Sequence, residues 1–250
     1  MPGTLYLIPN TLGAADPMQA DPLAFIIPPA VRTITAGIDY FIAENPKAAR
    51  GFLKLIATSH PLATPLQSIQ IAELNVNTPA SALPSLLAPL LAHQDAGLIS
   101  EAGVPAVADP GANLVRLAHI HGIPVKPLVG PSSLLLAVMA SGLNGQSFAF
   151  HGYLSTEATQ RAQTLKTLEE RSRREKQTQL FIETPYRNEA LLKALTTVCQ
   201  ANTWICVATD LTLASESIKT QPAAKWKNDL ASGRTPDFHK KPTIFLLLAE

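Results

Sequence analysis

The sequence predicts an α/β protein built from two domains, residues 1–129 and 130–250. Strand-like and helix-like segments alternate along nearly the whole chain, an order typical of mixed or mostly parallel sheets flanked by helices. Hydrophobic residues make up 46% of the 250 residues and charged residues 16%, which is enough apolar material for two cores. Small-residue loops follow two successive strand-like runs, at residues 101–109 and 130–133. Because open α/β sheets bind small molecules at such loops, we expect a ligand cleft between the two halves.

Apolar runs in the first half predict five strands, at residues 4–8, 40–43, 68–74, 97–100 and 125–129. Helix-like segments between them fall at residues 46–57, 80–93 and 110–121. The last of these helices has the clearest signals. Asp109 is placed as an N-cap, Pro110 follows at the first helical position, and Gly122 is placed to end the helix.

The second half repeats the alternation, with strands predicted at residues 147–153, 179–183, 204–209, 215–220 and 243–248. Helices are predicted at residues 156–176, 187–199 and 223–230. Residues 127–156 contain no Asp, Glu, Lys or Arg, but their solid apolar part, 134–143, is too short to span a bilayer, which needs about 20 residues. We therefore expect a fully buried helix there, at the centre of the molecule.

Charge and residue content exclude several classes of protein. The formal net charge of +1 excludes a nucleic-acid binder whose whole surface is basic, although it allows a local basic patch. The two cysteines, Cys199 and Cys206, match neither a disulfide framework nor a zinc site, and we expect reduced structural thiols. His119 and His121 lie on different faces of a predicted helix, so no metal site is expected. The N-terminus has no basic leader and no signal-type apolar core, which predicts a cytoplasmic protein with no membrane segment.

The loops also indicate what kind of ligand to expect. Neither the Gly-x-Gly-x-x-Gly dinucleotide motif nor the phosphate-binding loop that ends in Gly-Lys-Ser/Thr is present. Small residues at strand ends suit a ligand held by backbone groups and serine hydroxyls rather than a polyphosphate held by lysine. An adenosine-containing, weakly charged cofactor fits these loops.

Four motifs, in the right order, resemble the tetrapyrrole-methylase superfamily of S-adenosylmethionine-dependent methyltransferases. They are residues 97–111, 129–133 (Val-Gly-Pro-Ser-Ser), 148–154 and 183–187 (Glu-Thr-Pro-Tyr-Arg). The resemblance runs from Gly-Thr-Leu-Tyr at residues 3–6 to the last predicted strand. The residues in these motifs are most similar to those of the branch that methylates a ribose 2′-hydroxyl of small-subunit ribosomal RNA.

The resemblance implies a two-domain α/β fold, S-adenosylmethionine as cofactor, a cofactor cleft between the domains, and a homodimer. It also implies which residues contact the cofactor. In the first domain and at the start of the second these are Leu12, Ser100, Glu101, Ala102, Gly103, Val104, Ser132 and Ser133. In the second domain they are Thr184, Ala208, Leu211, Pro242 and Thr243.

Two segments depart from the pattern of that branch. Its usual Thr-Pro-Ile-Gly-Asn is Asn-Thr-Leu-Gly-Ala at residues 10–14, and its usual Ala-Glu-Asp-Thr-Arg is Ala-Glu-Asn-Pro-Lys at residues 43–47. The second change replaces an acidic group with Asn45 and removes a threonine. We therefore expect an altered acceptor pocket.

Methyl transfer from a sulfonium is an in-line displacement that needs alignment and no metal. A ribose hydroxyl is a poor nucleophile at neutral pH, so a positioned base would help. The candidates are Glu44, Glu101 and His151, each near a predicted strand end or loop. Each has an alternative interpretation: Glu101 could serve only to hydrogen-bond its loop, and His151 could be a hydrogen-bonded core histidine.

Basic residues mark the candidate RNA contacts. Arg171, Arg173 and Arg174 lie on the predicted helix at residues 156–176, and Arg187 follows a Pro-Tyr turn. The alternative interpretation is a solvated helix face for the three arginines and a surface helix start for Arg187. If these arginines contact RNA, they bind the phosphate backbone of the substrate.

The sequence therefore predicts a methyltransferase that acts on small-subunit ribosomal RNA. Two alternatives remain at this point. One is a methyltransferase of a small molecule such as a tetrapyrrole, and the other is a scaffold protein that kept the fold and lost the chemistry.

Overall fold

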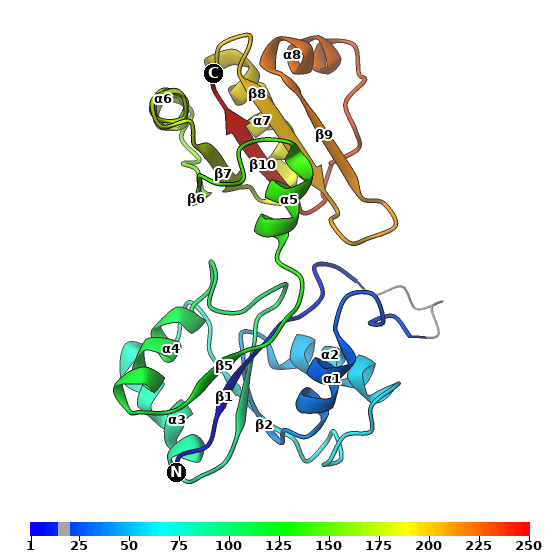
Figure 1. Cartoon of the computed structure of the whole chain (residues 1–250), viewed down its shortest axis with the longest axis vertical. Helices are drawn as coiled ribbons and strands as arrows, with labels where there is room; N and C mark the ends of the chain where they lie inside the picture. Colours follow the sequence, from blue (N-terminus) through cyan, green and yellow to red (C-terminus); the bar gives the residue numbers. More distant parts are fainter. Residues whose placement is uncertain (15–20) are drawn as a thin grey trace. The chain divides into compact units, whose positions relative to one another are not determined.

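The computed structural model describes residues 1–14 and 21–250 of the chain. The chain divides into two compact units, Met1–Ser132 and Ser133–Glu250, here called unit 1 and unit 2 (Figure 1). The domain boundary predicted between residues 129 and 130 stays a prediction. Each unit has its own sheet and its own hydrophobic core.

Unit 1 is an all-parallel five-stranded sheet in the order β3-β2-β4-β1-β5. Its strands are β1 (Leu5–Ile8), β2 (Tyr40–Ala43), β3 (Gln70–Glu73), β4 (Ala96–Ile99) and β5 (Val125–Pro127). Its helices are α1 (Pro29–Ala36), α2 (Pro46–Ala57), the short 3-10 helix η1 (Ala80–Ala82), α3 (Leu83–Leu91) and α4 (Gly111–Ile120). The predicted parallel sheet is confirmed.

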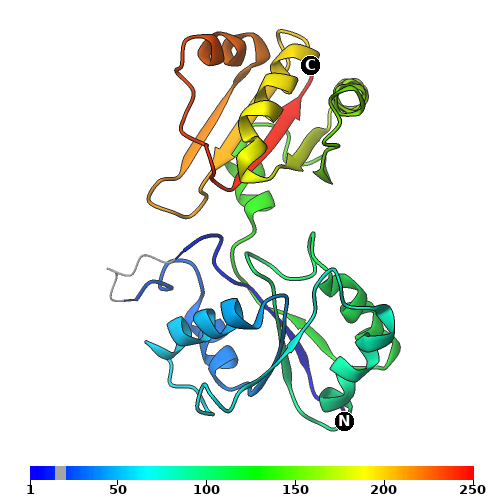
Figure 2. The ribbon, with the colours of Figure 1, turned by 180° about the vertical axis from the view of Figure 1, so that it is seen from behind.

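Both faces of this sheet are buried, because alternate strand residues point to opposite sides. On β2, Tyr40 and Ile42 pack with residues of α3 and α4, whereas Phe41 packs with residues of α1 and α2. Figure 2 shows the two helix pairs on opposite sides of the strands of unit 1. Close packing at the centre also requires Gly97 on β4, since a Cβ there would lie 2.6 Å from Ile8 Cδ1.

The structure differs from the predictions for unit 1 mainly in four elements. Helix α1 was not predicted, because β-branched Val31, Thr33, Ile34 and Thr35 obscure its helical spacing. The third and fifth strands are shorter than expected, and the helix predicted at residues 80–93 starts as 3-10 and ends at Leu91. These differences concern element ends and propensity, which tertiary packing overrides.

Unit 2 is a mixed sheet in the order β6-β7-β10-β8-β9, in which only β6 and β7 are parallel. Its strands are β6 (Phe148–Tyr153), β7 (Thr178–Ile182), β8 (Trp204–Thr209), β9 (Ser217–Pro222) and β10 (Thr243–Leu248). Its helices are α5 (Ser133–Ser141), α6 (Ala158–Glu175), the 3-10 helix η2 (Pro185–Arg187), α7 (Asn188–Val198) and α8 (Ala223–Ala231). The predicted α/β class holds for both units.

The core of unit 2 lies between the sheet and helices α6, α7 and α8. Trp226 of α8 is fully buried, and its indole Nε1 donates a hydrogen bond to the backbone oxygen of Ile205 at 2.9 Å. Helix α5 packs against β8, β9 and β10 on the side away from α7 (Figures 1 and 2). The Thr220 hydroxyl of β9 donates to the backbone oxygen of Ser141 at 2.8 Å, which holds the end of α5 on the sheet.

The expectation of a fully buried helix at residues 134–143 is wrong. Only Ala137, Val138 and Ser141 of α5 are buried, while Leu135 and Met139 are 58% and 80% exposed. The apolar residues surround this nine-residue helix on all sides, but only one side packs on the sheet. Within residues 1–14 and 21–250, no helix is long and apolar enough to cross a membrane.

Candidate functional site

The carboxyl ends of all five strands of unit 1 meet at one edge of the sheet, here called the carboxyl edge. After β1 and β2 the chain passes to α1 and α2, while after β4 it passes to α4 on the other face. The loops that follow β4 and its two neighbours therefore diverge. Open α/β sheets bind ligands at such a divergence, so the residues at this edge form the candidate site.

Asn10 joins the loop after β1 to the loop after β4. Its side-chain Nδ2 donates to the backbone oxygens of Ser100 and Glu101, both at 3.1 Å, and its Oδ1 accepts from the backbone N–H of Thr11 at 2.8 Å. The backbones add two hydrogen bonds, from Asn10 N to Gly103 O and from Gly103 N to Thr11 O. Asn10 is only 6% exposed, so these groups depend on one another for hydrogen bonds.

Two of the predicted cofactor contacts shape this loop. The buried Ser100 hydroxyl lies 3.1 Å from the backbone oxygen of Ala102 and 3.2 Å from that of Gly103, and can donate a hydrogen bond to either. Gly103 has φ +69°, and a Cβ there would lie 3.0 Å from Leu12 Cδ2 and 3.3 Å from Pro131 O. Glycine is therefore favoured at residue 103 both by conformation and by space. Leu12 and Gly103, predicted separately, lie side by side.

The rest of the loop continues in an uncommon conformation. Ala106 and Ala108 both have positive φ, at 64° and 63°. Val104, which directly follows Gly103, is half-buried. The Asp109 carboxylate accepts from the backbone N–H groups of Ala106 and Gly111, at 2.8 and 2.7 Å. The prediction of Asp109 as the N-cap with Pro110 at the first helical position is wrong by one residue: α4 begins at Gly111 and Pro110 is its N-cap residue, while Asp109, one residue earlier, still accepts from the first helical N–H. Burial raises the pKa of Asp109, against the lowering effect of these hydrogen bonds.

Two of the three predicted bases come together at the carboxyl edge. Glu44 follows β2 and Glu101 follows β4, and the backbone of Glu101 lies close enough to the Glu44 carboxylate to lower its pKa. Burial raises the pKa of Glu44, and the charges of Asp109 and Glu101 raise it further. Asn45 Nδ2 donates to Glu101 Oε1 at 3.3 Å. A cavity of about 410 Å³ opens onto this cluster, lined by Glu44, Asn45, Pro46, Glu73, Asn75, Val76 and Glu101.

His151, the third predicted base, belongs to unit 2. It lies on β6, and its Nε2 is 2.7 Å from Gln179 Oε1 on β7. Its half-buried ring thus has a hydrogen-bond partner within its own sheet. The contact fits the alternative of a core histidine, and the structure of unit 2 brings no carboxylate candidate to it.

In unit 2, most of the predicted cofactor residues gather where β8 ends and β10 begins. Ala208 pairs with Ile244 in the ladder between these strands, and the backbone N–H of Asp210 donates to Pro242 O at 3.0 Å. The Thr243 hydroxyl lies 3.2 Å from that of Thr209. Leu211, only 6% exposed, follows Asp210, whose φ is +51°.

Asn188 organises this region and was missed from the sequence. Its Nδ2 lies at 2.8 Å from the backbone oxygens of Phe238 and Lys241 and at 3.1 Å from the Thr243 hydroxyl. Thr184, exposed at the end of β7, precedes η2, and its N–H donates to the Glu183 carboxylate at 2.7 Å. Ser132 and Ser133 stand where unit 1 ends and α5 begins.

The predicted RNA contacts are engaged with other groups. Arg187 forms an ion pair of 2.9 Å with the buried Glu183 carboxylate. Arg171 and Arg174 both pair with Glu175, at 2.9 and 2.7 Å, on the exposed side of α6. Arg173 is half-buried, and its Nε donates to the backbone oxygen of Glu250 at 3.3 Å. The three arginines therefore do not form one continuous surface, although Arg171 and Arg174 share a face.

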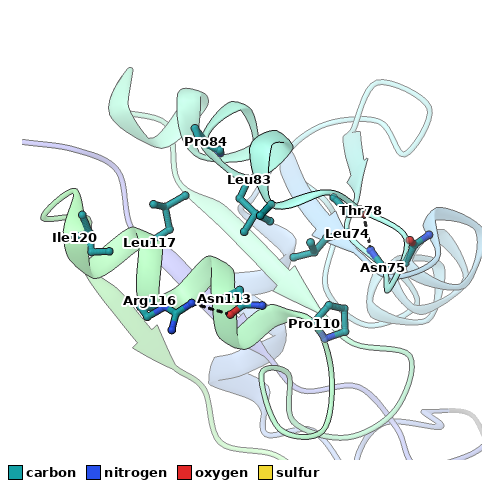
Figure 3. A pocket seen from close by; sticks show the side chains of 11 residues that line it. Leu74, Asn75, Thr78, Leu83, Pro84, Pro110, Asn113, Arg116, Leu117 and Ile120 are labelled. Carbon is teal, nitrogen blue, oxygen red and sulfur yellow. Dashed lines mark hydrogen bonds between the residues drawn. The ribbon is translucent and has the colours of Figure 1, made fainter.

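A second cavity, of about 380 Å³, lies between α3 and α4 (Figure 3). Leu83 and Pro84 from the α3 side and Leu117 from α4 line it, and Arg116 and Asn113 lie on α4 beside Pro110. Arg116 Nη2 donates to Asn113 Oδ1 at 3.1 Å. Asn75 lines both cavities, so this apolar groove begins at the carboxyl edge.

The charge of the carboxyl edge limits its ligands. The loops after β1, β2, β3 and β4 carry Glu44, Glu73, Glu101 and Asp109, and no Lys or Arg occurs in residues 9–14, 43–46, 73–78 or 100–110. A polyphosphate would be repelled there, whereas a mainly neutral ligand with a positive centre is favoured. In the described part of the chain, no three His, Cys, Asp or Glu side chains form a group that could hold a metal ion.

Comparison with known proteins gave relatives among ribosomal RNA methyltransferases. No family model matches the chain. The chain is 31% identical over 210 residues to ribosomal RNA small subunit methyltransferase I of Synechocystis sp.. The aligned stretch covers 84% of this chain and 67% of that protein. The proteins of the same name from Escherichia coli O157:H7 and Xylella fastidiosa are 28% and 27% identical, over 89% and 92% of this chain and 70% and 77% of their own lengths.

Solved structures share the fold at low identity. The methyltransferase CobJ superposes with a TM-score of 0.62 at 15% identity, covering 99% of this chain and 94% of its own. Uroporphyrin-III C-methyl transferase from Thermus thermophilus, solved with S-adenosyl homocysteine, gives a TM-score of 0.55 at 16% identity, covering 98% and 97%. These similarities confirm the predicted two-domain α/β fold.

Proposed function

The chain belongs to the ribosomal RNA small subunit methyltransferase I family, a branch of the tetrapyrrole-methylase superfamily, and we propose that it methylates a ribose 2′-hydroxyl of small-subunit ribosomal RNA. The observation that carries this proposal is the similarity to these relatives over 84% to 92% of the chain, which includes residues of both units. The predicted resemblance to this family is confirmed. The methylated atom is proposed from the motifs of the sequence.

S-adenosylmethionine is the methyl donor of this proposal, and the carboxyl edge fits it chemically. The bound cofactor supplies an electrophilic methyl group on a positively charged sulfur. Acidic side chains and the absence of Lys and Arg from the surrounding loops complement that charge. In unit 1 we assign the cofactor to Leu12, Ser100, Glu101, Ala102, Gly103, Val104 and Ser132, and at the start of unit 2 to Ser133. In unit 2 we assign it to Thr184, Ala208, Leu211, Pro242 and Thr243.

Backbone conformation supports this assignment independently of sequence. Gly103, Ala106 and Ala108 have positive φ in the loop after β4, and Asp210 and Thr212 have positive φ in the loop after β8. Non-glycine residues rarely adopt this conformation, which costs free energy and gathers at functional sites. The same two loops contain six of the thirteen assigned cofactor residues, namely Ser100, Glu101, Ala102, Gly103, Val104 and Leu211.

In the reaction, the acceptor oxygen forms a bond to the methyl carbon while the carbon–sulfur bond breaks. The chain aligns the two reactants, excludes water and receives the proton of the hydroxyl. Glu44, Glu101 and His151 are the residues proposed to receive it. Arg171, Arg174 and Arg187 are proposed to contact phosphates of the RNA, with Arg173 as a further candidate. We further propose that the enzyme works as a homodimer in the cytoplasm.

Calorimetric titration of the cofactor-free protein with S-adenosylhomocysteine, followed by methyl transfer to undermethylated small ribosomal subunits, tests the proposal. We expect a dissociation constant near micromolar, about 8 kcal/mol, and incorporation of labelled methyl into RNA as a 2′-O-methylribose. Labelling of a tetrapyrrole in place of RNA would support the small-molecule alternative. A folded protein that binds no cofactor at millimolar concentration would support a scaffold and refute the proposal.

A further inference from the structure

The carboxyl-edge cavity of unit 1 contains three carboxylates and two amides in an ordered arrangement. Glu44, Glu73 and Glu101 line it together with Asn45 and Asn75. Asn45 Nδ2 donates to Glu101 Oε1 at 3.3 Å, and Asn75 Nδ2 hydrogen-bonds Glu73 Oε1. Each amide thus donates to a different carboxylate, Asn45 to Glu101 and Asn75 to Glu73.

The orientation of both amides is fixed by the backbone. Asn45 Oδ1 accepts from the N–H groups of Lys47 and Ala48, at 3.0 and 3.2 Å, as the N-cap of α2. Asn75 Oδ1 accepts from the N–H of Asn77 at 2.8 Å. Because an amide oxygen accepts and an amide nitrogen donates, these contacts leave each Nδ2 facing its carboxylate.

Glu44 differs from its two neighbours. Within residues 1–14 and 21–250, no side-chain donor hydrogen-bonds its carboxylate, whereas Glu101 and Glu73 each accept from an amide. It is half-buried but lines the cavity, so an acceptor can reach it. The charged groups that face it are Asp109 and Glu101, which follow β4, and Glu73 at the end of β3 lines the same cavity. Burial and the negative charges of Asp109 and Glu101 disfavour the charged form of Glu44.

We propose that Glu44 is the residue that takes the proton of the acceptor hydroxyl, and that Asn45 and Asn75 are positioning residues that hold Glu101 and Glu73 in place. This inference rests on the proposed function and selects one of its three candidate bases. As the oxygen–carbon bond forms and the carbon–sulfur bond breaks, the hydroxyl proton passes to the Glu44 carboxylate and is then lost to water. Glu101 and Glu73 each already accept a hydrogen bond from an amide, which leaves Glu44 as the carboxylate of this cavity without a side-chain donor.

The first test compares kcat of the Glu44→Gln variant with that of the wild type, in the complete enzyme with RNA and S-adenosylmethionine. Loss of a general base predicts a decrease of kcat of about 10² to 10⁴-fold, with the dissociation constant of S-adenosylhomocysteine within twofold of wild type. If the variant keeps more than a tenth of the wild-type kcat, Glu44 does not take the proton.

The second test changes charge beside the base and leaves the helix cap in place. Asn45→Asp and Asn45→Ser both retain an oxygen that caps α2. Asn45→Asp also adds a negative charge next to Glu101, so we expect the acid limb of the kcat–pH profile to move up by roughly half a unit to one unit. Asn113→Asp adds the same charge on α4, in the other cavity, and is the matched control for which no movement is expected.

A readout that needs no substrate separates failure of this inference from failure of the proposed function. NMR titration of the glutamate carboxyl carbons, assigned with Glu44→Gln, reports the protonation of Glu44 directly. We expect its midpoint to rise in Asn45→Asp and not in Asn113→Asp. Equal midpoints in all three proteins would refute the charge coupling, whereas a coupled Glu44 in an enzyme that methylates no RNA would refute only the function.

Discussion

Replacement of Asn10 by alanine tests whether one buried amide holds the site loops of unit 1 together. The side chain makes three hydrogen bonds, to Ser100 O, to Glu101 O and from Thr11 N. Alanine removes all three and leaves the buried Ser100 carbonyl and Thr11 N–H without these partners. We therefore expect Asn10→Ala to destabilise unit 1 and to weaken cofactor binding.

The magnitude follows from the burial of each bond. A buried polar group left without a partner costs about 1–3 kcal/mol, and a hydrogen bond that water can replace costs about 0.5–1.5 kcal/mol. Two of the three bonds are buried and the one to Glu101 O is only partly buried. Allowing for relaxation of the loops, we expect a loss on the order of 3 kcal/mol in the free energy of unfolding of unit 1.

The position of the two tryptophans gives this measurement an internal control. Trp204 and Trp226 both lie in unit 2, so tryptophan fluorescence in a urea titration follows that unit alone. Hydrogen exchange of amides in β1 and β4 follows unit 1. We expect exchange in β1 and β4 to accelerate in Asn10→Ala while the fluorescence transition stays where it is in wild type.

Thr11→Val is the matched control in the same loop, because in the described part of the chain the Thr11 hydroxyl donates to the backbone oxygen of Gly13, within its own loop. It should cost about 1 kcal/mol and leave cofactor affinity nearly unchanged. If Asn10→Ala changes the stability of unit 1 by less than Thr11→Val does, Asn10 does not hold the two loops together and the reasoning fails.

Three further predictions concern the loop, the thiols and the surface of α6. Gly103→Ala should cost about 1 kcal/mol, because φ is +69°, and lower S-adenosylhomocysteine affinity at least tenfold by calorimetry; unchanged affinity would place the cofactor elsewhere. Burial raises the pKa of Cys199 to about 12 and that of Cys206 to about 11, so at pH 8 neither should react with a thiol reagent until the protein is unfolded. The double variant Arg171→Gln/Arg174→Gln should weaken RNA binding and lower its salt slope by about 1.4, with cofactor affinity unchanged; an equal salt slope would remove both arginines from the RNA contact.

Elements with a regular apolar pattern and a distinct end signal could be predicted closely from the sequence. The bounds of β2, β8, β10 and α2 agree residue for residue with their predictions, and α4 differs by one residue at each end. The pattern fails where packing rather than periodicity decides. Helix α1 has β-branched residues on a helix, and α5 is apolar on every side although it packs on one side only.

The candidate site shows the same division. Sequence placed Glu44 and Glu101 at strand ends, and parallel topology then brings such residues to one edge. It placed His151 in the second domain but could not show that Gln179, 28 residues further along the chain, is its hydrogen-bond partner. Nor could it show that Arg187 pairs with Glu183 four residues earlier, because that pairing depends on how the chain turns from β7 into η2.

The asparagines at residues 10 and 45 form hydrogen bonds in the structure that the family pattern does not predict. Compared with that pattern, Asn10 replaces a threonine and Asn45 replaces an acidic residue. In the structure each amide accepts from its own backbone through Oδ1 and donates to the loop after β4 through Nδ2. A carboxylate at residue 45 would cap α2 equally well but would repel Glu101, and a threonine at residue 10 has only one hydroxyl proton to offer two carbonyls. The two departures therefore act on the same loop, residues 100–103, which the family resemblance assigns to the cofactor. They are better explained as a substituted set of loop contacts than as the decay of an active site, and this favours an enzyme over a scaffold.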